Sequence, residues 1–218
     1  MTAPAPSVSH PQRGLPEQAS PADSKTLRRA IRRRRRALTP SQQREASKAL
    51  ERRLRRDPLF RFARRIALYQ ASARDGEIDP AGLLTLALRR GKRCHLPVMR
   101  RDGPQRLVWR RYRPGDALRR GPYGIMEPRW RAPGLPAWGL DLVLLPLVAF
   151  DPQGNRMGMG KGFYDRTFAF KRRGRRSRPR LVGLAHDCQK VEALTAAAWD
   201  VPLDAVVTPS ATYHFQRR

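Results

Sequence analysis

Apolar positions in the first part of the chain recur at the spacing of amphipathic helices. Between Ala22 and Leu38 they fall near one face of a helix, and a run of arginines covers the remaining face. The sequence Thr39-Pro40-Ser41-Gln42 then predicts the start of a second helix, because Thr39 can cap it and Gln42 can complete a capping box. The apolar stripe of this second helix consists of Ala46, Ala49, Leu50 and Leu54.

Beyond these helices, short apolar runs alternate with helical patterns. The runs predict strands over residues 65–69, 92–98, 106–112, 141–150, 180–185 and 204–208. Further helices are predicted over residues 79–90, 163–170 and near 191–198. The Gly- and Pro-rich residues 121–136 predict an ordered loop, and the basic residues 171–179 predict a mobile insertion. This alternation indicates an α/β fold whose central sheet is mainly parallel, with helices on both faces.

The most informative segment follows the apolar run that ends at Phe150. Its glycines and charged residues are Gly154, Arg156, Gly158, Gly160, Lys161, Gly162 and Asp165. Glycines allow the backbone to approach an anion, backbone N–H groups can then point at it, and the cations neutralise further charge. A carboxylate beside bound phosphate can hold Mg²⁺. The segment therefore predicts a phosphate-binding loop, although it has neither the P-loop form nor the glycine spacing of a Rossmann dinucleotide site.

Length and composition limit the alternatives. With 218 residues, of which 40% are hydrophobic, the chain can form one sizeable domain. We place this domain at residues 22–218, after a disordered N-terminal extension of residues 1–21 that lacks the apolar core of a signal peptide. No apolar run approaches the length of a membrane span. The two cysteines, Cys94 and Cys188, lack metal-ligand spacing, which is typical of a reduced, cytoplasmic protein.

The formal net charge of +28 is the most unusual feature of the composition. Only six of the 46 basic residues are lysines, and such an excess of arginine can arise from a GC-rich coding sequence or from contacts with nucleic acid. We favour the first interpretation because no recognised RNA- or DNA-binding motif occurs, and we do not expect nucleic acid as a partner. A nucleic-acid-binding protein is the alternative from another class, and tight binding at physiological salt would support it.

Taken in order, the motifs resemble those of the 5-formyltetrahydrofolate cyclo-ligase family. The central match runs from Leu145 to Thr167 and contains Pro-x-x-Ala-Phe-Asp, Gly-x-Arg-x-Gly and Gly-x-Gly-Phe-Tyr-Asp-Arg. Further matches, in the order of the family, are Asp75-Gly-Glu-Ile-Asp79, Gly91-Lys-Arg-Cys-His-Leu-Pro97, Tyr123-Gly-Ile-Met-Glu-Pro128, Gly183-Leu-Ala-His-Asp-Cys-Gln189 and the segment from Trp199 to Pro209. Each motif alone is weak, but their combination in this order is specific.

This resemblance implies a single three-layer α/β/α domain with a mainly parallel central sheet, Rossmann-like and of the NagB/RpiA/CoA-transferase type. It implies an enzyme that uses ATP and Mg²⁺ to cyclise 5-formyltetrahydrofolate to 5,10-methenyltetrahydrofolate, with release of ADP and phosphate. The formyl oxygen would be phosphorylated, and N10 would then close the ring. We expect a cytoplasmic monomer that acts on these small molecules and does not bind a membrane.

The resemblance also assigns roles to residues of this sequence. The catalytic residues would be Arg156, Lys161 and Glu77. ATP would contact Lys25, Arg28, Gly154, Arg156, Gly158, Gly160, Lys161, Gly162 and Tyr164. The folate substrate would contact Glu77, Met159, Gly160, Lys161, Gly162 and Phe163. Mg²⁺ would be held by Asp165 and Asp200.

Some of these assignments leave alternatives open. Asp204 is the alternative to Asp200 as the second metal carboxylate. Arg29 is the alternative to Arg28, because the N-terminal basic pair differs by one residue from the family's usual spacing. Many relatives carry glycine at the position of Lys161, which gives this lysine a supplementary role. The aromatic residues that could either stack on the pterin or pack in the core are Trp109 and Tyr123.

Overall fold

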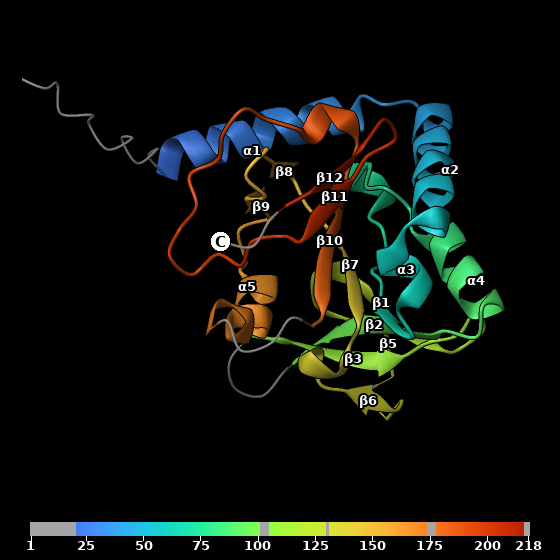
Figure 1. The fold of residues 1–218 in the computed structure, drawn as a ribbon. Coiled ribbons are helices and arrows are strands. Elements are labelled where there is room, and N and C mark those ends of the chain that lie inside the picture. Colours follow the sequence, from blue (N-terminus) through green and yellow to red (C-terminus); the bar gives the residue numbers. More distant parts are fainter. Residues whose placement is uncertain (1–20, 101–104, 130, 174–177, 216–218) are drawn as a thin grey trace, which may run out of the picture.

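The computed structural model describes residues 21–100, 105–129, 131–173 and 178–215 (Figure 1). Its centre is an eight-stranded sheet with the strand order β12-β11-β10-β7-β1-β2-β3-β6. The strands of this sheet are β1 (Arg65–Ala67), β2 (Arg93–Met99), β3 (Leu107–Arg111), β6 (Gly134–Leu135), β7 (Leu142–Pro146), β10 (Arg180–Leu184), β11 (Ala205–Val207) and β12 (Thr212–His214). The strands from β11 to β2 run parallel, whereas β12, β3 and β6 pair antiparallel towards the two edges. The mainly parallel sheet predicted from the sequence is thereby confirmed.

The other elements surround this sheet. The α-helices are α1 (Pro21–Arg36), α2 (Pro40–Arg56), α3 (Pro58–Phe62), α4 (Ala81–Arg89) and α5 (Phe163–Phe168). Two small antiparallel pairs are β4 (Leu118–Arg120) with β5 (Met126–Pro128), and β8 (Ala149–Phe150) with β9 (Arg156–Met157). The 3-10 turns are η1 (Ala73–Asp75), η2 (Pro122–Gly124), η3 (Ala137–Gly139), η4 (Ala169–Arg173) and η5 (Asp187–Gln189). No helix in the described ranges has the length and apolar character that a membrane crossing requires.

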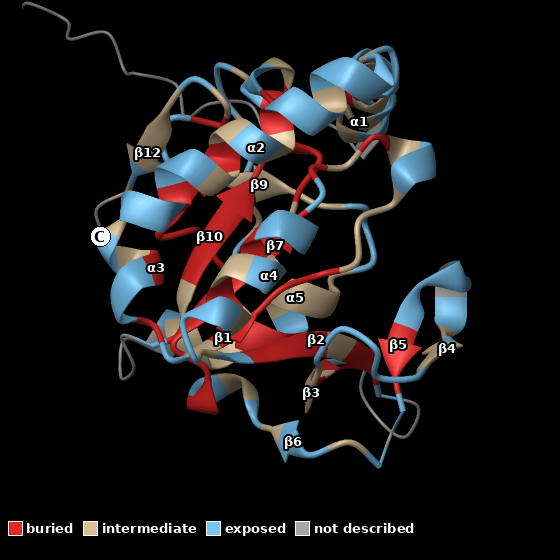
Figure 2. Cartoon of the chain, turned by 90° about the vertical axis from the view of Figure 1, so that its right-hand side faces the viewer, coloured by how far each residue is buried: buried red, intermediate tan, exposed pale blue. Residues whose placement is uncertain are grey.

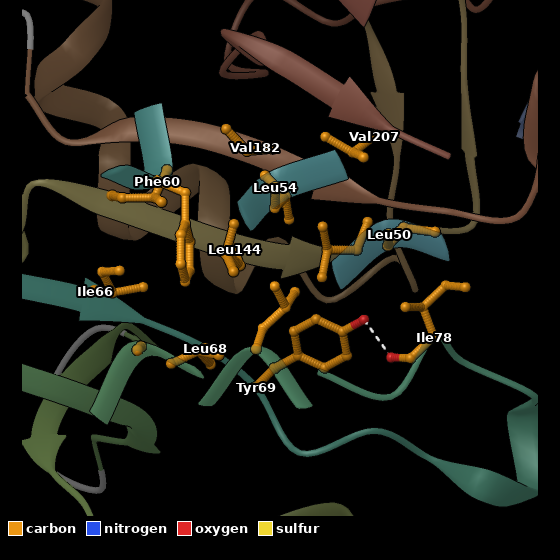
Figure 3. Close-up of a cluster of buried hydrophobic side chains, with 14 of the residues drawn as sticks. Leu50, Leu54, Phe60, Ile66, Leu68, Tyr69, Ile78, Leu144, Val182 and Val207 are labelled. Carbon is orange, nitrogen blue, oxygen red and sulfur yellow. Dashed lines mark hydrogen bonds between the residues drawn. The ribbon is translucent and has the colours of Figure 1, made fainter. Parts of the chain in front are cut away.

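Helices α2, α3 and α4 cover one face of the sheet. The predicted capping box at the start of α2 is present, because Gln42 N donates to the Thr39 hydroxyl at 3.2 Å and Thr39 N donates to the Gln42 side chain at 2.8 Å. The buried stripe of α2 faces the strands, and Figure 3 shows Leu50 and Leu54 beside Leu144 of β7. Burial of such a leucine stabilises the fold by about 1.5–3 kcal/mol.

A second apolar cluster lies on the opposite face of the sheet. It includes Val143, Leu145, Trp109, Phe150, Phe168, Val201 and Leu203. Successive side chains of a strand point to opposite faces, so alternate residues of β7 enter the two clusters. The rings of Trp109 and Phe168 lie 6.0 Å apart, which brings α5 against β3. The buried strands therefore form the middle layer between helices whose outer surfaces are exposed (Figure 2), and the predicted three-layer α/β/α domain is confirmed.

Helix α1 lies over the carboxyl ends of the central strands instead of covering a face of the sheet (Figure 1). Its buried Ile31 packs with Val148 and Ala149, which follow β7. The helix also contacts η1, which follows β1, and η5, which follows β10. Three connections that leave the same end of the sheet are thus covered by one helix.

The structure corrects several local predictions. Residues 121–136 are not a continuous loop, because they contain β5 and β6, and the predicted strand over residues 141–150 is interrupted between β7 and β8. Residues 191–198 form no helix: Val191 N donates to Phe150 O at 2.9 Å and Leu194 N donates to the Asp151 carboxylate at 3.0 Å. These tertiary hydrogen bonds use amides that a helix would need. Residues 1–20 of the predicted extension and residues 174–177 of the predicted insertion lie outside the described residues.

Candidate functional site

Two segments that carry predicted site residues leave the sheet side by side. β1 and β7 are parallel neighbours, with Ala67 opposite Val143, so their carboxyl ends lie at the same edge. The connection after β1 contains Glu77 and leads to α4, whereas the connection after β7 contains the glycine-rich loop and leads to α5. These two helices pack on opposite faces of the sheet. Open α/β sheets bind ligands where neighbouring strands send their connections to opposite faces, so this point is the candidate site.

The glycine-rich loop consists of residues 151–162. Hydrogen bonds to Asp151 fix its first turn. This side chain is buried, and its Oδ1 accepts Gln153 N at 3.0 Å and Asn155 N at 2.9 Å. Its Oδ2 accepts Asn155 Nδ2 at 2.8 Å and the amide of Leu194 at 3.0 Å. One carboxylate therefore satisfies the polar groups of the turn and fastens the loop to the C-terminal part of the chain.

Three glycines of the loop adopt a backbone conformation that side chains disfavour. The φ angles are +86° at Gly154, +86° at Gly160 and +62° at Gly162. At Gly154 the requirement is also steric, because a Cβ would lie 2.7 Å from Cγ of Phe215. The glycine pattern of the sequence therefore reflects backbone geometry at these positions.

Arg156 and Asp165 form an ion pair beneath the loop. Arg156 Nη2 donates to Asp165 Oδ1 at 2.6 Å, and the two side chains are 6% and 16% exposed. The same carboxylate oxygen accepts Val201 N at 3.2 Å. The guanidinium carbon of Arg156 lies 5.8 Å from the ring centroid of Tyr164, and Arg156 Nε is buried without a hydrogen-bond partner in the described residues. Asp165 and Tyr164 thus fix the Arg156 side chain, while its Nε has no acceptor among the described residues.

Helix α1 reaches the loop through Arg28. Arg28 Nε donates to Gly158 O at 3.0 Å, and its guanidinium lies close to Gly160. Arg29 is exposed, so Arg28 is the member of this pair that faces the loop. Lys25, one turn earlier, is also exposed. The structure therefore brings Arg28 to the predicted phosphate loop.

Glu77 enters the site from the neighbouring connection. Its side chain is 12% exposed, and its Oε2 accepts Ser72 N at 3.0 Å. Burial raises the pKa of Glu77 above its ordinary value, while the hydrogen bond from Ser72 and the charge of Arg35 act in the opposite direction. Burial also raises the pKa of Tyr164, and the charge of Glu77 adds to that effect. The carboxylate of the β1 connection therefore acts electrostatically on a residue of the β7 connection.

Comparison with known proteins identifies the family to which this chain belongs. Residues 20–209 match the model of the 5-formyltetrahydrofolate cyclo-ligase family. The chain belongs to this family. The cyclo-ligase of Escherichia coli (strain K12) is 41% identical over 186 residues, which cover 85% of this chain and the whole of that protein. The cyclo-ligase of Haemophilus influenzae is 39% identical over 178 residues, which cover 81% of this chain and 92% of that one.

A solved structure supports the same relationship. The NMR structure of Aquifex aeolicus 5,10-methenyltetrahydrofolate synthetase is 30% identical, with a TM-score of 0.75 over 89% of this chain and 94% of that one. The synthetase of Mycoplasma pneumoniae, at 22% identity and a TM-score of 0.66, shows the same fold. ATP as a co-substrate of this chain follows from the cyclo-ligase family.

The two candidates for a second metal carboxylate have different surroundings. Asp204 is buried and paired with Arg180 at 2.9 Å and Lys171 at 3.5 Å, where β10 and β11 begin. Asp200 accepts Ala197 N at 2.9 Å and directly precedes Val201, whose amide binds Asp165. Asp200 is thus the chain neighbour of a residue that binds Asp165, whereas Asp204 lies at the opposite end of the strands. Within the described ranges, no group of three or more metal-binding side chains is assembled.

The remaining predicted residues differ in their exposure. Met159 and Lys161 are exposed, and Phe163 is half-buried at the start of α5, where the Arg166 guanidinium lies 5.5 Å from its ring centroid. Trp109 is fully buried and packs against Tyr164 at 6.5 Å between ring centroids, which identifies it as a core residue. The side chain of Tyr123 is not among those described.

Two residues of the site were not found from the sequence. Asp151 precedes Pro-Gln-Gly-Asn, and an Asp before such a turn is a known signal for local hydrogen bonding. Arg35 is buried beside Glu77, but it stands within a run of five arginines. Its position four residues after Ile31, on the same helical face, was the one available signal.

Proposed function

We propose that this chain catalyses the ATP-dependent cyclisation of 5-formyltetrahydrofolate to 5,10-methenyltetrahydrofolate. The observation that supports the proposal is that the connections carrying Glu77 and Arg156 leave the carboxyl ends of the neighbouring parallel strands β1 and β7, where Glu77 acts electrostatically on Tyr164. One segment offers cations and glycine backbone for phosphates, and the other offers a carboxylate with a raised pKa. An ATP-dependent ring closure needs both kinds of group.

The reaction we propose has two chemical steps. First, the formyl oxygen attacks the γ-phosphorus of ATP, the bond to the bridging oxygen breaks, and ADP leaves. Second, N10 attacks the activated formyl carbon, loses its proton to a base, and the carbon–oxygen bond breaks to release phosphate. The methenyl cation that forms bridges N5 and N10.

We assign the phosphate roles to the loop and to α1. Arg156 and Lys161 would stabilise the charge on the transferred phosphoryl group, with Arg28 on the nucleotide phosphates. The glycines at positions 154, 158, 160 and 162 would allow the backbone amides to approach the phosphates. The buried donor Nε of Arg156 supports this assignment, because an anion would supply its missing acceptor.

Glu77 is our candidate for the base that receives the N10 proton. Its raised pKa supports this role, because a carboxylate with an ordinary pKa is a weak base. Phe163 and Tyr164, both half-buried at the start of α5, would flank the folate and the nucleotide, with Met159 and the adjoining glycine backbone completing the folate contacts.

Mg²⁺ is part of the proposal, and the residues present suit an ion that arrives with the nucleotide. Mg²⁺ is commonly held by one or two carboxylates together with phosphate oxygens, so a cage made only of protein side chains is not required. Asp165 would supply one carboxylate and Asp200 the other. When bound, the ion would neutralise charge on the phosphates. Cytoplasmic location and a monomeric state stay predictions.

The direct test is the absorbance of the methenyl product formed by purified protein with ATP, Mg²⁺ and 5-formyltetrahydrofolate. We expect one ADP per methenyl group and no product when ATP is omitted. Glu77→Gln should lower kcat by about 10²-fold or more, as expected for loss of a general base. Glu45→Gln is the matched control, because Glu45 is 63% exposed and pairs with Lys48 on the surface. Absence of product from folded wild-type protein would overturn the proposal.

A further inference from the structure

Arg35 is the buried member of the arginine run on α1. Its side chain is 2% exposed, whereas those of Arg32 and Arg36 are 28% and 44% exposed. Ile31 and Arg35 share the helical face that meets the ends of the sheet, since residues four apart lie one above the other. A charged side chain is costly at such a place unless the protein pairs it. The contacts of Arg35 should therefore explain why a charged residue is buried at this position.

These contacts join the two connections that form the candidate site. Arg35 Nε donates to Asp75 O at 2.6 Å in the connection after β1, and Nη1 donates to Leu147 O at 3.1 Å in the connection after β7. Nη2 lies 3.8 Å from Glu77 Oε1 and makes no hydrogen bond within the described residues. Because the guanidinium is a rigid planar fork, fixing two of its nitrogens also fixes the direction of the third.

The charge of Arg35 is the principal positive charge acting on Glu77. Burial raises the pKa of Glu77, the Ser72 amide and Arg35 oppose that rise, and Arg32 opposes it to a smaller extent. Asp75 acts in the same direction as burial. Two tyrosines, Tyr69 and Tyr164, lie within electrostatic range of Glu77 from the start of the β1 connection and from α5. Among the charged groups around Glu77, Arg35 thus has both the geometry and the charge to control it.

We propose that Arg35 is a positioning residue for Glu77, holding its carboxylate in the site and favouring its ionised form through the Nη2–Oε1 ion pair during cyclisation. The proposal rests on the proposed function, because it acts through the base assigned there. Arg35 itself is not required to touch the folate or ATP. Its effect should therefore depend on the presence of the Glu77 carboxylate.

The test is the pH dependence of kcat in single and double variants. Arg35→Met removes the charge and retains the side-chain length, so the pKa of the acid limb of the kcat profile should rise by about one unit or more. Arg35→Lys keeps the charge and should leave that limb closer to wild type, with a lower kcat because the fork is lost. Arg33→Met, on an exposed position of the same helix, is the matched control and should leave the profile unchanged.

A double-mutant comparison separates positioning from general support of the fold. Arg35→Met should lower kcat by about tenfold or more in the wild-type background and by less than about twofold in the Glu77→Gln background. An equal loss in both backgrounds, with an unshifted acid limb, would overturn the proposal. If Arg35→Met does not fold, as judged by circular dichroism, the loss of kcat caused by Arg35→Lys is compared in the two backgrounds instead, and an equal loss in both would overturn the proposal. Failure of the wild-type protein to form product would instead count against the proposed function.

Discussion

The ion pair between Arg156 and Asp165 allows a quantitative prediction for Asp165→Asn. The substitution removes the negative charge but keeps an oxygen that can accept Val201 N. Arg156, which is 6% exposed, then loses its counter-charge. Loss of one partner of a buried pair costs about 3–5 kcal/mol, and the retained hydrogen bonds favour the lower end, about 3 kcal/mol. For a protein of this size that corresponds to a fall in Tm of about 6–12 °C.

Thermal unfolding followed by circular dichroism, without nucleotide, measures this change. Glu45→Gln is again the matched control, because an exposed pair contributes less than about 1 kcal/mol. Titration of activity with Mg²⁺ provides the functional part: we expect the variant to need more Mg²⁺ for half-maximal rate. A Tm within about 2 °C of wild type would refute the claim that the pair is energetically important, and an unchanged Mg²⁺ titration would remove Asp165 from the proposed metal ligands.

Three further predictions concern the loop and its surroundings. Gly154→Ala should destabilise the fold by about 1–2 kcal/mol or more, because φ is +86° and the new Cβ would meet the Phe215 ring; urea unfolding equal to wild type would contradict this. Arg156→Ala should lower kcat more than it changes the KM for folate in steady-state assays, and the reverse pattern would indicate a binding role. Although burial raises the pKa of Asp75, hydrogen bonds from two arginines of α1 lower it from 3.8 to about 2. Its stabilising effect, about 1 kcal/mol after solvent screening, is therefore present above pH 3.8 and lost as the pH falls towards 2. Asp75→Asn should flatten the dependence of Tm on pH in that window, and an unaltered slope would show that Asp75 does not contribute.

The elements that the sequence predicted well are those whose signals are local. The capping box at Thr39 and Gln42 and the apolar stripe of α2 need only neighbouring residues, and both are present. The strand β7 was predictable because a strand buried on both faces is apolar throughout. The edge strand β12 is short and half-buried, so it leaves little pattern in the sequence.

The parts that could not be predicted depend on distant contacts. Residues 191–198 have the composition of a helix, yet their amides bond to Phe150 and Asp151, about forty residues earlier. For the candidate site, the family motif located the loop and Glu77, but the roles of these residues stay predictions. Arg35 could not be separated from the neighbouring arginines, because its burial depends on how α1 crosses the ends of the strands.

The attachment of α1 has a consequence for how the protein loses function. This helix fully buries one large apolar side chain, Ile31, in the described structure, and Leu27 packs partly buried in the same small cluster. Most of its other ties are polar: Arg28 to Gly158, Arg35 to two carbonyl groups, and Arg32 with Arg36 to Asp75. Salt weakens the partly exposed ion pairs of Arg32 and Arg36 with Asp75, whereas it acts less on the buried Arg35 and does not screen the apolar clusters under α2 to α4 and α5. Elements with few apolar contacts open locally at a lower free energy than the whole domain. High ionic strength should therefore loosen α1 and lower activity while the sheet stays folded, so that inactivation and denaturation become two separate events.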